Sequence, residues 1–292
     1  EELKEENTPE GTICIYYCNE NIITFKVNYD FKMTNEAVII ETLKNKEYVE
    51  ELSANKILSL VSKTSKYLLV PKIYLKYQDE SFNIIVQSTA RGEELGKVII
   101  DAYSDRNDEM KNKKLLNSLY VLGVSVSELH NYNVVHTDPR ESLIKYRLFE
   151  KINTKIDDLK LYPNIIQFLN LSKLQLYFEN HLSWYSSLNQ KLSYVHGDLS
   201  FSNIFFDQES NKITMIDAGG LTSHTKEQRP IGLPIYEIHQ FKSSLRQLQG
   251  LNDLDDSFVD SLYKQFELGY NKNISASSSY SKNEKFSIAI GF

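Results

Sequence analysis

The most informative part of the sequence is the stretch 194–220, YVHGDLSFSNIFFDQESNKITMIDAGG. A histidine, a glycine and an aspartate follow one another in it as His196, Gly197 and Asp198. An asparagine, Asn203, comes five residues after the aspartate. These polar groups precede apolar, β-prone residues, so we expect them on a loop that leads into a strand.

Two short apolar segments in this stretch predict a β-hairpin. The segments 203–206 and 212–216 flank a polar turn at 207–211. The second segment ends in an acid, Asp217. Because the two ends of a hairpin meet, we expect Asn203 and Asp217 to lie on one side, close to the loop before the first strand.

The residue types suit phosphoryl transfer. Mg²⁺ prefers hard oxygen ligands, so it accepts a carboxylate, an amide carbonyl and the phosphate oxygens of ATP. A second carboxylate must lie near the attacking hydroxyl to orient it and take its proton. We expect Asp198 to be this catalytic base, and Asn203 and Asp217 to bind the metal and, through it, the nucleotide. We expect His196 to support the loop backbone rather than transfer protons.

The spacing of these residues resembles that of a known superfamily. Asp-x4-Asn is the spacing of the protein-kinase catalytic loop. The longer form H-G-D-x4-N, followed by an apolar run and the pair Ile216-Asp217, resembles the aminoglycoside phosphotransferase and choline kinase branch of the kinase-like fold. The segment GLPIYEIHQFKSSL, 232–245, is similar to a helix start in that superfamily, with Glu237 where relatives commonly carry an aspartate that steadies the catalytic loop. The C-terminal part resembles members associated with bacterial capsule and surface-polysaccharide gene sets.

The resemblance implies both a fold and an activity. The fold is α+β, two-lobed and protein-kinase-like, with a small antiparallel β N-lobe and a mainly helical C-lobe. We assign residues 1–88, a sheet plus one helix, to the N-lobe and residues 89–292 to the C-lobe. The activity is that of a kinase that uses Mg²⁺ and moves the γ-phosphoryl of ATP to a hydroxyl of a small molecule. The acceptor class includes sugars, amino sugars, polyols and aminoglycoside-like alcohols, with a role in surface-glycan biosynthesis.

Composition narrows the function classes. Hydrophobic residues make up 41% and charged residues 25%, as in ordinary globular proteins. The net charge of −6 argues against a nucleic-acid groove, which needs clustered Lys and Arg. Cys14 and Cys18 have no partner cysteines for a zinc site, and two cysteines fit a reducing cytoplasm. The acidic start, EELKEEN, does not resemble a signal peptide, and no apolar run predicts a membrane span.

The first third of the chain is β-prone. Residues 1–10 are polar and we expect them to form a tail. We expect an antiparallel sheet from runs at 12–17, 21–27 and 37–43. Residues 68–76, with Pro71 inside, should form an edge strand or a broken strand, and residues 82–87 a further strand. Residues 88–95 would then form the hinge between the lobes and supply adenine-binding backbone.

Kinase-like folds use a lysine–glutamate pair to bind the nucleotide phosphates, and several residues of this sequence are candidates for that pair. The alternatives are a shifted pair, Lys44–Glu51, a swapped pair, Glu41–Lys56, the further lysines Lys26 and Lys32, or no pair at all. Each of these residues could equally be a solvent-exposed surface charge, so we assign none of them to the site.

The remainder is mainly helical. Apolar residues at spacings of three and four predict helices at 46–62, 111–132, 235–249 and 254–270. His130 lies at the end of the second of these helices, where we expect a structural role. The aromatic-rich segment 163–190, with Trp184, is expected to pack in the core of the C-lobe rather than form a ligand-stacking surface. Residues 285–292 resemble the start of a helix, so we expect the sequence to be truncated.

A second histidine and acid, His136 and Asp138, lie in VVHTDPR at 134–140. The position five residues after Asp138 is Leu143, which cannot bind a metal. We therefore interpret this segment as a loop before a helix, with lining of the acceptor pocket as the alternative.

Two further hypotheses compete with a small-molecule kinase. A pseudokinase that binds a nucleotide or a protein partner would follow from a missing lysine–glutamate pair. A kinase-like enzyme that modifies a protein or transfers a nucleotidyl group is the third. The presence of all three residues, Asp198, Asn203 and Asp217, favours an active enzyme over a pseudokinase. The sequence leaves open the acceptor, the choice of ATP or GTP and the oligomeric state.

Overall fold

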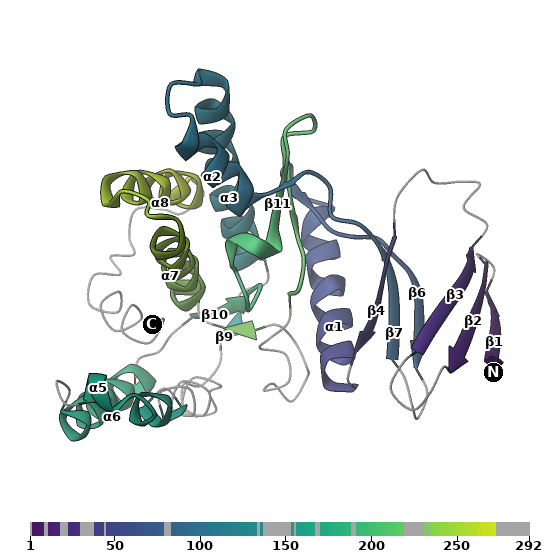
Figure 1. Cartoon of the computed structure of the whole chain (residues 1–292), viewed down its shortest axis with the longest axis horizontal. Coiled ribbons are helices and arrows are strands. Elements are labelled where there is room, and N and C mark those ends of the chain that lie inside the picture. The colour runs from purple at the N-terminus through teal and green to yellow at the C-terminus, as the bar shows by residue number, and fades with distance from the viewer. Residues whose placement is uncertain are drawn as a thin grey trace. The chain divides into compact units, whose positions relative to one another are not determined.

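The computed structural model (Figure 1) describes residues 2–8, 11–17, 23–29, 38–43, 45–78, 83–132, 135–136, 153–154, 156–166, 170–187, 191–218, 231–232 and 234–272. The chain forms two compact units. Unit 1 comprises residues 1–43 and 72–89, and unit 2 comprises residues 44–71 and 90–292.

Unit 1 is built from antiparallel strands. One three-stranded sheet has the order β1-β2-β3 and the other has the order β4-β7-β6. The strands are β1 (Glu2–Thr8), β2 (Gly11–Tyr17), β3 (Ile23–Tyr29), β4 (Val38–Leu43), β6 (Ile73–Gln78) and β7 (Asn83–Ser88). The predicted β-prone runs are therefore strands, although the third run pairs in the second sheet rather than beside β3.

The prediction of a polar tail at residues 1–10 is wrong. Residues Glu2–Thr8 form β1, which pairs antiparallel with β2, from Thr8 opposite Gly11 to Glu2 opposite Tyr16. An edge strand needs backbone hydrogen bonds on one side only, and charged side chains are common on such strands. The polar composition of this segment was therefore compatible with a strand.

Unit 2 contains two further sheets. The larger has the order β5-β12-β11-β8, with β5 parallel to β12 and the other pairs antiparallel. The smaller has the order β13-β10-β9. Their strands are β5 (Leu68–Leu69), β8 (Glu93–Glu94), β9 (Val135–His136), β10 (Lys191–Tyr194), β11 (Ile204–Asp207), β12 (Lys212–Met215) and β13 (Ile231–Gly232). Residues 68–76 form a broken strand, one of the two predicted alternatives, because β5 ends before Pro71 and β6 begins after it.

The helices of unit 2 follow the predicted apolar spacing. They are α1 (Asn45–Ser62), α2 (Leu95–Ser104), α3 (Glu109–Asn131), α5 (Pro163–Ile166), α6 (Leu171–Ser187), α7 (Pro234–Asn252) and α8 (Asp256–Asn271). The helix α3 begins at a capping aspartate, because the Asp108 carboxylate accepts from the backbone N–H groups of Met110 and Lys111. No described helix combines the length and apolarity needed to cross a membrane.

One hydrophobic core connects these elements. The apolar faces predicted for α1, α3 and α7 are buried in it, together with residues of α2, α8 and the hairpin β11–β12. Since the buried face of α1 belongs to this core, α1 lies in unit 2, although we assign it to the N-lobe from sequence. The division at residues 88 and 89 stays a prediction.

The expected core packing of segment 163–190 does not hold for Leu176 and Tyr177, whereas Leu171 and Leu174 are half-buried. Leu176 and Tyr177 on α6 are 56% and 42% exposed, and Tyr162 just before α5 is 58% exposed. Aromatic content alone does not distinguish a core helix from an exposed one, because much of any protein surface is apolar. The side chain of Trp184 lies outside the described residues.

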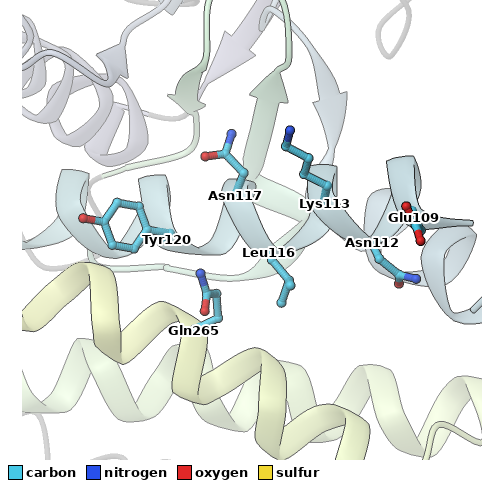
Figure 2. A pocket seen from close by; sticks show the side chains of 7 residues that line it. All are labelled: Glu109, Asn112, Lys113, Leu116, Asn117, Tyr120 and Gln265. Carbon is cyan, nitrogen blue, oxygen red and sulfur yellow. The ribbon is translucent and has the colours of Figure 1, made fainter.

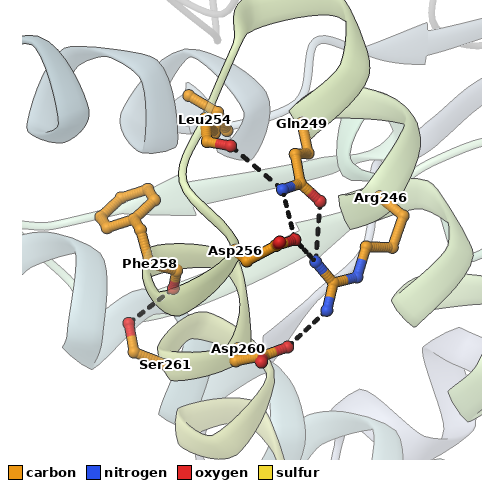
Figure 3. A network of polar contacts seen from close by, with 7 residues as sticks. All are labelled: Arg246, Gln249, Leu254, Asp256, Phe258, Asp260 and Ser261. Atoms are coloured by element: carbon orange, nitrogen blue, oxygen red, sulfur yellow. Dashed lines mark hydrogen bonds and ion pairs between the residues drawn. The ribbon is translucent and has the colours of Figure 1, made fainter.

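A polar network ties the end of α7 to the start of α8 (Figure 3). Arg246 donates from Nη1 to the Asp256 carboxylate at 2.8 Å and from Nη2 to Asp260. Gln249 donates to the same Asp256 oxygen at 2.8 Å and to the carbonyl of Leu254 at 3.0 Å. The hydrogen bond from Gln249 and the charge of Arg246 lower the pKa of Asp256. These contacts fix the turn between the helices.

The helices α3 and α8 cross in close backbone contact at two glycines. A Cβ atom on Gly269 would lie 2.0 Å from the carbonyl oxygen of Tyr120, and one on Gly123 would lie 2.1 Å from that of Phe266. In contrast, a Cβ atom on Gly250 of α7 would meet nothing within 4 Å. The crossing therefore requires glycine, whereas the α7 position does not.

Alanine at the two sites should change stability in opposite directions. Gly269→Ala should lower the free energy of unfolding by about 3 kcal/mol, because backbone atoms must move apart. Gly250→Ala should raise it by about 0.5–1 kcal/mol, because alanine is the better helix former. Urea unfolding of both variants tests this. A stabilised Gly269→Ala variant would contradict the close crossing.

Candidate active site

The loop that carries the predicted site connects β10 to β11. We call residues 196–203 the HGD loop. It ends in a short 3₁₀ turn, η3 (Phe201–Asn203), directly before β11. Gly197 has φ +91°, a backbone conformation that side chains other than glycine rarely adopt. The loop therefore turns sharply between the buried His196 and the exposed Asp198.

The Asp198 carboxylate is exposed but held at both oxygens. The side-chain amide of Asn203 donates to Oδ2 at 3.0 Å and to the Asp198 carbonyl at 3.1 Å. The side-chain amide of Gln240 donates to Oδ1 at 3.0 Å. Asn203 is itself only 8% exposed, so its orientation is fixed by its surroundings. An accessible carboxylate in a fixed orientation is what a group that receives a proton from a small hydroxyl compound requires.

The predicted hairpin is confirmed. Strands β11 and β12 pair antiparallel from Ile204 opposite Met215 to Asp207 opposite Lys212. At the turn, the Asp207 carboxylate accepts from the backbone N–H of Glu209 at 3.0 Å and from the hydroxyl of Ser210 at 2.7 Å. Turns closed in this way by an aspartate are common between paired strands.

Asn203 and Asp217 lie at the open end of this hairpin, as expected. The backbone N–H of Ile216 donates to the carbonyl of Asn203 at 3.0 Å, which brings the next residue, Asp217, beside the HGD loop. Asp217 is exposed and has φ +53°, in the left-handed region. Aspartate tolerates this region better than most residues, although at some conformational cost. The structure thus brings Asp198, Asn203 and Asp217 to one end of the hairpin.

A buried polar chain supports the loop from behind. Glu237 on α7 is 1% exposed and accepts from the backbone N–H of Gly197 at 2.7 Å. Its second oxygen lies 2.7 Å from Nε2 of His130, whose Nδ1 lies 2.8 Å from the hydroxyl of Tyr270. The helices α3, α7 and α8 thereby meet behind the loop. The structural roles predicted for His130 and Glu237 agree with these contacts.

His196 is a structural part of the loop. It is fully buried, and its Nδ1 accepts from the backbone N–H of Asp198 at 3.3 Å. Burial lowers the pKa of His196, and the charges of Glu237 and Asp198 act in the opposite direction. His196 therefore braces the backbone around Asp198.

Sequence reasoning missed two contacts that α7 makes with the loop. Gln240 holds Asp198, and the hydroxyl of Ser244 accepts from the backbone N–H of Phe201 at 3.1 Å. The only signal was a spacing of four residues between two polar side chains of an amphipathic helix. Many solvent-facing residues share that spacing.

Several candidates lie outside the described residues. Lys32, Lys44, Cys18 and Asp138 are among them, and of Glu41, Lys26 and Cys14 only the backbone is described. The choice among the predicted phosphate-gripping pairs therefore stays open. His136 lies in β9, whose backbone pairs with β10 at Lys191. The expected hinge and its adenine-binding backbone also stay a prediction.

A shallow pocket of about 530 Å³ lies between α3 and α8 (Figure 2). Its lining residues are Glu109, Asn112, Lys113, Leu116, Asn117, Tyr120 and Gln265. None of them belongs to the HGD loop or to the hairpin strands. The side-chain amide of Asn117 donates to Asn211 at 2.6 Å, which links the pocket to the turn of the hairpin. The pocket is therefore separate from the predicted site.

Comparison with solved structures identifies the fold. An aminoglycoside phosphotransferase from Streptomyces rimosus, APH(3'')-Id, solved with ADP and streptomycin, matches 91% of this chain over 88% of its own, with a TM-score of 0.55 and 13% identity. An aminoglycoside-3'-phosphotransferase of type VIII matches 100% of this chain over 93% of its own, with a TM-score of 0.54 and 13% identity. No protein-family model and no curated protein gives a significant match to the sequence. The two-lobed α+β architecture expected from the sequence is thus confirmed, and this chain has the protein-kinase-like fold of the aminoglycoside phosphotransferases.

Proposed function

We propose that this protein is a small-molecule kinase that transfers the γ-phosphoryl group of ATP, with Mg²⁺, to a hydroxyl group. The observation that carries the proposal is the exposed Asp198 carboxylate, fixed by amide hydrogen bonds at both oxygens. Asp198 orients the acceptor hydroxyl and accepts its proton as the phosphorus–oxygen bond forms. The bond between the γ-phosphorus and the bridging oxygen breaks, and ADP leaves. Such catalysis comes mainly from positioning and charge neutralisation.

Asn203 and Asp217 are the proposed ligands of the metal. Both side-chain N–H interactions of Asn203 go to Asp198, so its carbonyl oxygen is the atom left for a cation. Asp217 adds an exposed carboxylate at the same end of the hairpin. In the described part of the chain, no three His, Cys, Asp or Glu side chains converge as a metal site. This fits Mg²⁺, which binds through one or two protein oxygens and completes its shell with phosphates and water. When bound, it supplies charge neutralisation on the phosphates.

The fold likeness and the sequence resemblance support the proposed acceptor class. The Streptomyces rimosus structure contains ADP and streptomycin, a pairing of nucleotide and small hydroxyl compound. We therefore propose an amino sugar, sugar, polyol or aminoglycoside-like alcohol as acceptor, with surface-glycan biosynthesis as the setting. Transfer of ³²P from [γ-³²P]ATP to a panel of such compounds tests this. Labelled product identifies the class, and no label on any compound would reject it.

Metal-dependent nucleotide binding should depend on Asp217. We expect Mg²⁺ and ATP together, at about 100 times the dissociation constant, to add roughly 2.7 kcal/mol to the free energy of unfolding. Each alone should add much less. The Asp217→Asn variant should lose most of the joint effect, because an amide binds Mg²⁺ less well than a carboxylate. Thermal unfolding with Mg²⁺, ATP, both or neither measures this.

Asp253 offers a matched control. It is also exposed and has φ +50°, but it lies in the turn between α7 and α8. Asparagine tolerates this backbone conformation, so Asp253→Asn should keep the full response to Mg²⁺ and ATP. If wild type shows no shift at millimolar ATP, the pseudokinase alternative is favoured over the kinase, and a protein partner becomes the next search.

A further inference from the structure

Helix α7 contacts the HGD loop through a row of polar side chains. The row follows the three- and four-residue spacing that places side chains on one face of a helix. Its three contacts are Glu237 with Gly197, Gln240 with Asp198, and Ser244 with Phe201. Two of these contacts hold the loop backbone. The contact of Gln240 is different, because it holds the carboxylate itself.

Gln240 can act only as a donor toward this carboxylate. Its Nε2 lies 3.0 Å from Oδ1 of Asp198. Its Oε1 is buried and has no hydrogen-bond partner among the described residues. An amide that pointed the other way would set two acceptor oxygens against each other. The orientation of Gln240 is therefore fixed by Asp198, and the carboxylate is fixed in turn.

We propose that Gln240 is a positioning residue that holds the Asp198 carboxylate in the orientation needed to receive a proton from the acceptor hydroxyl. The inference rests on the proposed function for its catalytic part. Asn203 alone fixes one oxygen, so an exposed aspartate could still rotate about its side-chain bonds. The second amide on Oδ1 removes that freedom. Small displacements of a reacting group are costly in rate, which is why a residue outside the loop affects turnover.

Removal of the donor should lower turnover without weakening nucleotide binding. For Gln240→Ala we expect kcat to fall about tenfold to hundredfold while KM for ATP changes less than about twofold. The assay is ATP turnover with Mg²⁺, with water or an acceptor found in the panel. Gln247→Ala is the matched control, because Gln247 is an exposed glutamine of the same helix and should leave kcat unchanged.

The isosteric variant Gln240→Glu separates donation from packing. It keeps the shape of the side chain but sets a second carboxylate against Asp198, and two such groups resist ionising together. We expect at least as large a loss as in Gln240→Ala, together with a displaced acidic limb of the pH–rate profile. A purely structural role for Gln240 would leave Gln240→Glu active with an unchanged profile.

A double variant tests whether Gln240 acts through Asp198. In the Asp198→Ala background, Gln240→Ala should cause no further loss of kcat, because the effects of groups that act as a unit are not additive.

The contact between Gln240 and Asp198 can also be tested without measuring turnover. The NMR signals of the Gln240 side-chain amide, assigned by their absence in Gln240→Ala, should move in Asp198→Ala, while those of Gln247 should not.

The outcomes separate the two proposals. Wild type without any ATP turnover rejects the proposed function, and the amide signals then decide whether Gln240 holds Asp198. An active wild type with a Gln240→Ala variant of unchanged kcat overturns the positioning role. The positioning role is also overturned if Gln240→Ala lowers kcat equally in the wild-type and Asp198→Ala backgrounds. It is likewise overturned if the NMR signals of the Gln240 amide do not move in Asp198→Ala.

Discussion

Asp198→Ala should abolish phosphoryl transfer while leaving the binding of ATP and Mg²⁺ nearly intact. Loss of a group that accepts a proton in the transition state lowers rates by about 10² to 10⁴-fold. Nucleotide binding should persist because the proposed metal ligands are Asn203 and Asp217. We would measure turnover of [γ-³²P]ATP and, in parallel, the thermal shift produced by Mg²⁺ and ATP.

Asp198→Asn is the companion variant. It keeps the size of the side chain and a carbonyl oxygen for one of the two amides, but it cannot accept a proton. We expect it to be as inactive as Asp198→Ala, with less disturbance of Asn203. Turnover close to wild type in either variant would refute the assignment of the base. Loss of nucleotide binding in both would instead place Asp198 among the metal ligands.

Glu237→Ala should be among the most destabilising substitutions in the chain. Glu237 is 1% exposed and holds the N–H of Gly197 with one oxygen and His130 with the other. Removing one partner of a buried charged or hydrogen-bonded pair costs about 3–5 kcal/mol, because the groups left behind are unpaired. The free energy of unfolding in urea measures the loss.

Glu237→Gln should cost less, about 1–3 kcal/mol, because the amide keeps one acceptor oxygen and can satisfy only one of the two contacts fully. The matched control is Glu209→Gln at the exposed hairpin turn, which should change stability by less than about 0.5 kcal/mol. Turnover should fall in both Glu237 variants, since the N–H of Gly197 anchors the loop before Asp198. A Glu237→Ala variant as stable as Glu209→Gln would show that the buried chain does not hold the loop.

The local parts of the site were predictable from sequence. The hairpin, its polar turn and the approach of Asn203 to Asp217 all follow from residues that are close in the chain. The alternation of apolar segments and a turn rich in Asp, Ser and Asn specifies such a hairpin without help from elsewhere. The buried faces of α1, α3 and α7 were likewise predictable, because apolar residues at helical spacing must face a core.

Two predictions failed in whole or in part because they rested on amino-acid composition and not on which elements pack against the segment. Residues 1–10 are polar, yet most of them form an edge strand. The backbone hydrogen bonds to β2 do not depend on the charge of the side chains. The segment 163–190 is rich in aromatic residues, yet Tyr177, whose side chain is described, is 42% exposed. In both cases the structure of the segment depends on the element that packs beside it, and this neighbour cannot be identified from a single sequence.

The HGD loop, the hairpin and the resemblance to a kinase-like fold could be predicted without a structure, because each depends on residues a few positions apart. The resemblance also pointed to Glu237 as a support of the loop, but the contacts of Gln240 and Ser244 became visible only in the folded structure. The three contacts from α7 join residues 40 to 43 positions apart, and the chain from His130 reaches Glu237 over 107 positions. A polar residue on an amphipathic helix is equally compatible with solvent and with a buried partner. The packing of α7 against the HGD loop gives Gln240 and Ser244 their partners, and the hydrogen bond from Gln240 holds the carboxylate of Asp198.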